Sequence, residues 1–141
     1  MGSKLGITTK LQEEFDFDIV DEFISHYGIM SESMEPTIIS LSHKENYSIG
    51  INNLFRVAHN IKSATGFLKV DVINVFFMTV EDVLEKARIL EGPASEEFID
   101  WLLLVSDQMN LWLKNFNNDE NLALVNEKIY VFPKNLTVTS D

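Results

Sequence analysis

Apolar residues recur every three or four positions along most of this chain, the spacing of a helix with one buried face. No stretch alternates strongly between apolar and polar residues, as a half-buried strand would. The pattern therefore predicts an all-α protein. Its first helix runs from about Asp18 to His43, with apolar positions at Val20, Phe23, Tyr27, Met30, Met34, Ile38 and Leu41.

Three further long helices are predicted, with short loops between them. They cover about 49–68, 71–90 and 96–116, and the last begins after Ser95, whose side chain can cap it. Asp71 is the expected N-cap of the helix over 71–90, and Gly92-Pro93 is typical of a stop after it. Four long amphipathic helices with short connections predict an antiparallel up-down four-helix bundle.

A shorter helix is predicted after the bundle, and the chain ends are predicted to be flexible. Leu122, Val125 and Ile129 have helical spacing within about Asp119 to Ile129, which indicates an additional C-terminal helix. Residues 1–16 and 131–141 are expected to be a flexible N-terminus and a C-terminal tail.

Composition limits the classes of function. The 141 residues, 45% of them hydrophobic, suit one globular domain. A formal charge of −11 disfavours nucleic acid and anionic membrane surfaces, and favours a protein partner with a basic or apolar docking face. The absence of cysteine excludes thiol catalysis and disulfides. With no signal peptide and no apolar run long enough to span a bilayer, we expect a cytoplasmic protein without membrane insertion.

The helix over 49–68 places a histidine on its solvent side. Its buried stripe is expected at Ile51, Leu54, Ala58, Ile61, Thr65 and Leu68. His59 points about 130° away from that stripe at 100° per residue. Near His59 on the same face lie Phe55, Arg56, Lys62, Ser63 and Gly66. An exposed imidazole beside cations and small residues is an arrangement for handling a phosphoryl group.

The run LFRVAHNIKSATGFL, followed by VEDVLEKAR, resembles a histidine phosphotransfer domain, most closely the N-terminal one of chemotaxis-type histidine kinases. The resemblance covers about residues 17–130. It implies that His59 is the phosphoacceptor, that Lys62 lies beside the phosphoryl group, and that Glu81 hydrogen-bonds the histidine. The remaining correspondences are Phe55 and Arg56 with the family's Phe-Arg pair, Gly66 with its glycine, Ser63 where glycine is usual, and Met78 where some members have a second histidine.

A mechanism follows from this resemblance. Glu81 accepting the Nδ1 proton of His59 would leave Nε2 as the nucleophile, and Lys62 would neutralise charge on the phosphoryl oxygens. Gly66 and Ser63 would give partners access to the imidazole. Because no phosphate-binding glycine loop is present, we expect a phosphoryl carrier without cofactor or metal and not an enzyme. Its partners would be a histidine kinase catalytic domain and the receiver domain of a response regulator, whose aspartate takes the phosphoryl group.

Several alternatives stay open at this point. The alternative function is that of a non-catalytic helical interaction module with a degenerate phosphotransfer fold. Gly66 has alternative interpretations as a helix C-cap or a tolerated interior glycine, while Lys62 and Glu81 have alternatives as solvated surface charges. The methionines, Met78 included, are expected in the core. The chain can be a free-standing protein, which a starting Met1 permits, or a segment of a longer kinase.

Overall fold

The computed structural model describes residues 6–138 and is built from helices. The elements are α1 (Ile7–Glu14), α2 (Phe17–Ser40), α3 (Lys44–Phe67), α4 (Asp71–Arg88), α5 (Glu96–Asn117) and the short 3-10 helix η1 (Glu127–Tyr130). Within residues 6–138 there is no β-strand, only a single antiparallel bridge between Ala94 and Thr137. The all-α fold class is therefore confirmed.

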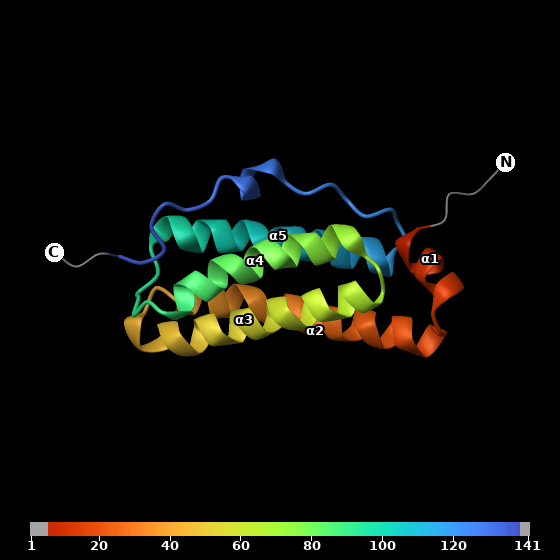
Figure 1. The fold of residues 1–141 in the computed structure, drawn as a ribbon, viewed down its shortest axis with the longest axis horizontal. Coiled ribbons are helices and arrows are strands. Elements are labelled where there is room, and N and C mark those ends of the chain that lie inside the picture. The colour runs from red at the N-terminus through yellow and green to blue at the C-terminus, as the bar shows by residue number, and fades with distance from the viewer. Residues whose placement is uncertain (1–5, 139–141) are drawn as a thin grey trace.

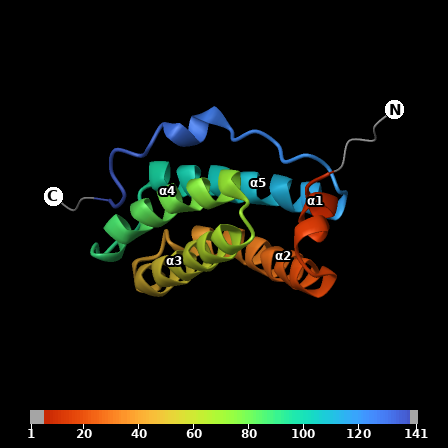
Figure 2. The ribbon, with the colours of Figure 1, turned by 45° about the vertical axis from the view of Figure 1, so that its right-hand side comes forward.

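Helices α2 to α5 form a bundle in which consecutive helices run in opposite directions, and α1 lies across one end (Figure 1). Helix α3 packs against α4 and α2, and α2 also packs against α5. The turned view shows the pair α2 and α3 as one layer and the pair α4 and α5 as the other (Figure 2). The four-helix up-down bundle is the predicted one.

The apolar stripes predicted from helical spacing form the core. The six positions of the stripe on α3 are all buried: Ile51, Leu54, Ala58, Ile61, Thr65 and Leu68. Ser95 caps α5 by accepting a hydrogen bond from the Phe98 backbone N–H at 3.1 Å, as predicted. Asp71, by contrast, is the first residue of α4, and the N-cap position is Val70, with no side-chain cap.

Met78 is a correction to the expected core. Its side chain is 49% exposed on α4, whereas Met34 and Met109 are buried as predicted. The position follows helical geometry, because the neighbouring Phe76, Phe77 and Val80 occupy the buried face of α4 and Met78 falls on the other side.

Helix α1 replaces part of the predicted flexible N-terminus. Its first N–H groups find acceptors in the turn after α5: Ile7 donates to the Glu120 carbonyl at 3.0 Å, and the Thr9 backbone N–H donates to Asp119 at 2.9 Å. The Thr8 hydroxyl donates to the Phe116 carbonyl at 2.6 Å. These acceptors lie more than a hundred residues away in the sequence. The local pattern of apolar residues therefore does not predict this helix. Residues 1–5 of the predicted flexible segment lie outside the described residues.

The predicted C-terminal helix over 119–129 is wrong. Residues 119–138, here called the C-terminal strap, run extended along α5 except for η1 (Figure 1). Side chains of α5 bind the strap backbone: Trp112 donates to the Ala123 carbonyl at 2.9 Å and Trp101 to that of Ile129 at 2.7 Å. These bonds take the place of intrahelical ones. The strap end also binds the α4–α5 loop, with Val138 donating to the Pro93 carbonyl at 3.0 Å, so the expected tail is attached up to this residue.

Candidate functional site

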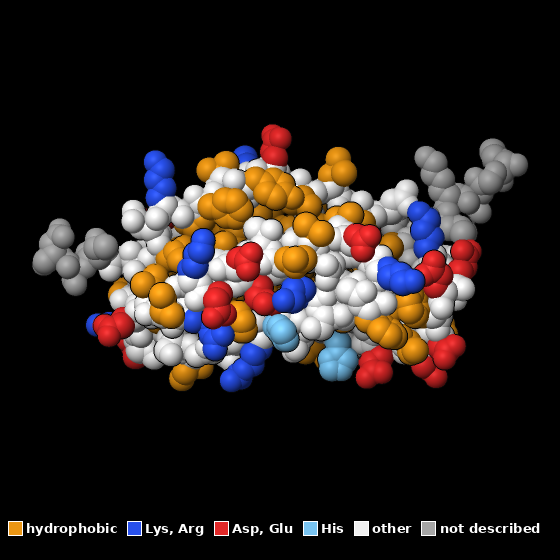
Figure 3. All heavy atoms as spheres, viewed as in Figure 1, with side chains coloured by type: hydrophobic (Ala, Val, Ile, Leu, Met, Phe, Trp, Pro, Cys, Tyr) orange, Lys and Arg blue, Asp and Glu red, His pale blue; other side chains and the backbone are white. Residues whose placement is uncertain are grey.

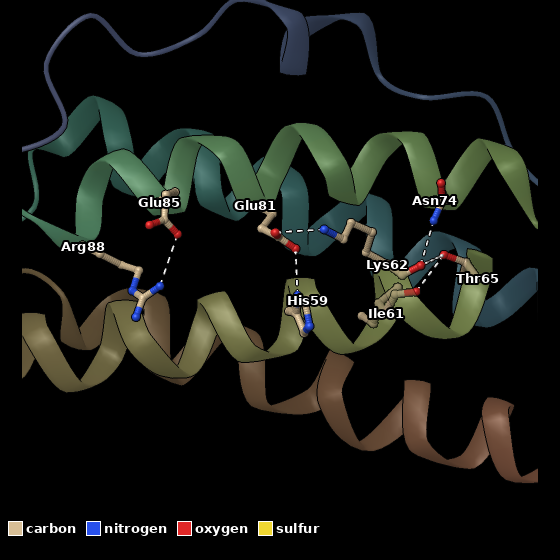
Figure 4. A network of polar contacts seen from close by, with 8 residues as sticks. All are labelled: His59, Ile61, Lys62, Thr65, Asn74, Glu81, Glu85 and Arg88. Atoms are coloured by element: carbon tan, nitrogen blue, oxygen red, sulfur yellow. Dashed lines mark hydrogen bonds and ion pairs between the residues drawn. The ribbon is translucent and has the colours of Figure 1, made fainter. Parts of the chain in front are cut away.

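Helices α3 and α4 bring the three predicted catalytic side chains together. The Nδ1 of His59 lies 3.3 Å from one Glu81 carboxylate oxygen, and the Nζ of Lys62 lies 2.9 Å from the other (Figure 4). The His59 side chain is 54% exposed and that of Glu81 only 17%. The imidazole is thus open to solvent while the carboxylate that orients it is sheltered between the helices.

The environment of Glu81 fixes its protonation state and the tautomer of His59. Burial alone would raise the pKa of Glu81, but the hydrogen bond and charge of Lys62, with a further contribution from His59, outweigh burial and lower the pKa below its usual range. An ionised carboxylate can only accept hydrogen bonds. The Nδ1 of a neutral His59 therefore carries the proton, and Nε2 keeps its lone pair.

Gly66 lies beside a contact that sequence reasoning missed. Asn74, at the start of α4, donates from its amide to the Lys62 backbone carbonyl at 2.7 Å (Figure 4). A Cβ added at Gly66 would sit 3.3 Å from that amide nitrogen. Gly66 is inside α3, which ends at Phe67 and is followed by the C-cap Leu68 and the left-handed residue Lys69. The C-cap interpretation of Gly66 is therefore wrong, and its exposed backbone leaves space on the His59 face.

The ring of Phe55 lies beside the imidazole of His59. The two rings are nearly parallel, at 12°, with ring centroids 6.3 Å apart. The guanidinium carbon of Arg88, near the end of α4, lies 4.3 Å from the centroid of the Phe55 ring. Arg88 was not singled out from sequence, because a basic residue in the last turn of a helix is common for reasons of helix dipole alone.

Arg56 and Ser63 lie on the exposed face of α3 but do not join this group of contacts. Neither side chain makes a hydrogen bond or ion pair in the part of the chain that is described. By helical position both lie on the flank of His59 opposite to Lys62, away from Glu81. The access for partners expected at Ser63 and the role that the resemblance implies for Arg56 stay predictions.

An apolar groove between α2 and α3 flanks the histidine on that other side. It has a volume of about 380 Å³ and is lined by Ile19, Glu22, Phe23, His26, Met30, Asn60, Ala64, Phe67 and Leu68. Asn60 follows His59 directly, and Ala64 and Phe67 continue along α3. On the face that Figure 3 shows, histidine side chains lie among basic, acidic and hydrophobic side chains.

Membrane-spanning helices and clusters of metal-ligating side chains are both absent among residues 6–138. No helix there has the length and hydrophobicity needed to cross a bilayer. No group of three or more His, Cys, Asp or Glu side chains there is arranged to hold a metal ion.

Comparison with known proteins finds a similarity to part of one histidine kinase. Over 113 aligned residues the chain is 28% identical to the Sensor histidine kinase CheAY of Helicobacter pylori (strain ATCC 700392 / 26695). The alignment covers 78% of this chain and 14% of the relative, so the chain matches only a small part of that protein. No protein-family model matches the chain. No solved structure matches it either.

Proposed function

We propose that this chain is a histidine phosphotransfer module of two-component signalling, of the chemotaxis type, and that His59 carries the phosphoryl group. The observation that carries the proposal is the contact of an exposed imidazole, through Nδ1, with a sheltered carboxylate that also binds Lys62. The similarity to part of a sensor histidine kinase supports the same function from an independent direction.

In the first transfer, the Nε2 lone pair of His59 would attack the γ-phosphorus of ATP held by a separate kinase domain. The N–P bond forms as the bond to the bridging oxygen breaks, and ADP leaves. Glu81 keeps the Nδ1 proton in place and stabilises the positive charge that develops on the ring. In the second transfer the N–P bond breaks, and a carboxylate oxygen of a receiver aspartate takes the phosphoryl group. The chain itself would act as carrier and not as enzyme.

Lys62 has a second role in this proposal. In the resting protein its ammonium group is 2.9 Å from Glu81, and its side chain is 30% exposed. Once a phosphoryl group is on Nε2, the flexible lysine stem allows the ammonium to turn toward the phosphoryl oxygens, which carry the charge in a loose transition state.

Both partners would have to dock beside His59. The groove between α2 and α3 offers apolar area next to the imidazole, in a protein whose charge of −11 repels acidic surfaces. This fits partner domains that present apolar side chains with basic residues around them.

The proposal is tested by incubating the chain with the ATP-binding domain of a histidine kinase from the same organism and labelled ATP. Acid-labile label on the chain, lost on addition of a receiver domain, is the expected result. Stable complexes with either domain and no acid-labile label would instead indicate the non-catalytic interaction module.

A further inference from the structure

Phe55 and Arg88 form a further contact between α3 and α4, in addition to those made by Glu81 and Asn74. Arg88 follows Glu81 by seven residues, about two helical turns. Phe55 precedes His59 by four residues, one turn, so its ring lies along the same face of α3. The Arg88 guanidinium lies over the ring of Phe55, and the Phe55 ring lies beside the imidazole and nearly parallel to it.

Two further hydrogen bonds fix the guanidinium over this ring. The Nε of Arg88 donates to the Asn52 side-chain oxygen at 3.2 Å, and one Nη donates to Glu85 at 3.2 Å (Figure 4 shows the Glu85 contact). Asn52 lies one turn before Phe55 on α3, while Glu85 lies one turn before Arg88 on α4. A planar guanidinium can make both bonds and still lie on an aromatic face, which an ammonium group cannot reproduce.

We propose that Arg88 is a positioning residue for phosphotransfer, acting through Phe55 on the orientation of the His59 imidazole. This rests on the proposed function. Glu81 holds the imidazole at one ring nitrogen only, and a single hydrogen bond leaves the ring free to tilt about that contact. The nearly parallel Phe55 ring restricts this tilt, and the cation on Phe55 keeps the phenyl ring from turning away. With Phe55 held, Nδ1 stays directed to Glu81 and Nε2 stays directed to solvent.

A purely structural role for Arg88 would have a different signature. If Arg88 only joined α3 to α4, its removal would lower stability without changing the rate per folded molecule, and the loss would not depend on Phe55. The side chain is 38% exposed, so its ion pair with Glu85 contributes little to stability. The positioning role is therefore separable by experiment.

The test uses Arg88→Met, Phe55→Leu and the double variant, with Lys86→Met on the same helix as the matched loss of a surface cation. We expect Arg88→Met to slow phosphorylation of His59 about two- to fivefold, the size of an exposed cation–π contact expressed as a rate. Phe55→Leu should slow it at least as much. Arg88→Met added to Phe55→Leu should change nothing further, and Lys86→Met should leave the rate unchanged.

A spectroscopic readout accompanies the rates. The ring-proton NMR signals of His59 should shift in Arg88→Met in the same direction as in Phe55→Leu, because both alter the Phe55 ring current at the imidazole. Equal slowing by Arg88→Met with and without Phe55, or unshifted His59 signals, would overturn the positioning role. Wild-type protein that takes up no phosphate on His59 would instead contradict the proposed function itself.

Discussion

The carboxylate of Glu81 contacts two side chains, His59 and Lys62, which would act at different stages of the proposed phosphotransfer. It accepts from His59 on one oxygen and from Lys62 on the other, and the two contacts together keep it ionised. A carboxylate held in this state directs the lone pair of His59 to the solvent side before any partner arrives. Under the proposed function, the resting site is thus already arranged for attack on phosphorus.

Lys62→Ala should slow phosphorylation of His59 by about tenfold or more, because a charge-assisted contact to the phosphoryl oxygens is lost. The fold should persist, since the pair with Glu81 is partly exposed and stabilises by about 1 kcal/mol or less. Phosphorylation rates and thermal unfolding measure the two effects. Lys44→Ala, which removes an exposed lysine at the start of α3, is the control and should have the wild-type rate.

The lowered pKa of Glu81 predicts a pH-dependent contribution to stability. A carboxyl whose pKa is lower in the folded state stabilises the protein above its unfolded-state pKa, and this contribution disappears as the pH falls through the folded-state value. The free energy of unfolding of wild type should exceed that of Glu81→Gln near neutral pH, and the difference should vanish in acid. Urea unfolding at a series of pH values measures it; a difference that stays constant into acid would show that Glu81 is not ionised through these contacts.

At this scale much of the site could be predicted from sequence. The direction of His59 followed from the stripe opposite to it, and the positions of Lys62 and Glu81 followed from the resemblance. Asn74 and Arg88 could not be found, because their roles depend on the register between α3 and α4. An isolated Asn or Arg on one helix carries no sign of which carbonyl or ring it meets on the next.

At the scale of the helices, α3 carries His59 and Lys62, and Gly66 is an exposed position on the same face of this helix. Leucine there would favour the helix by several tenths of a kcal/mol, yet its Cβ would press on the Asn74 amide, and its branches would cover the His59 face. We expect Gly66→Leu to fold and to lose most transfer with both partners, while Gly66→Ala loses less. Transfer rates and thermal unfolding on both variants check this. Normal transfer per folded molecule in Gly66→Leu would refute the access role.

The first turn of α1 depends on Asp119, so we expect Asp119→Asn to loosen α1 without affecting phosphotransfer. Hydrogen bonds from the side chain and then the backbone of Thr9 lower the pKa of Asp119, so this cap is present near neutral pH and is lost as the pH falls through that lowered value. Hydrogen exchange at the Thr9 amide should accelerate in the variant. Unchanged protection of that amide would show that α1 is held by its apolar contacts alone.

The C-terminal strap shows where prediction from the local pattern of apolar residues fails. The strap has three apolar residues at helical spacing, yet Gln108 and Asn115 on α5 are buried and bind its backbone: the Asn126 N–H donates to Gln108 and the Ala123 N–H to Asn115. Buried amides on the apolar face of α5, and an Asn-rich stretch after it, were the available signals, because such residues favour bonds outside helices.

In the whole molecule, the strap covers one side of the bundle, while the site lies where α3 of one layer meets α4 of the other. The strap runs along α5, on the side of the bundle away from α2 and α3 (Figures 1 and 2). His59 is an exposed residue of α3, and the apolar groove lies between α2 and α3. The bundle could be predicted from sequence because four long stripes leave little choice of packing. Which helices the strap covers could not be predicted, because the course of the strap depends on hydrogen bonds to buried polar side chains of α5.

The central claim is that His59 alone carries phosphate, and His59→Gln tests it most directly. The exposed position makes the change in stability less than about 0.5 kcal/mol, so thermal unfolding should be that of wild type. Incubated with the kinase domain and labelled ATP, wild type should gain acid-labile phosphate and His59→Gln should gain none. Equal acid-labile labelling of the folded variant would contradict the account, because the phosphoryl group would then be on another residue.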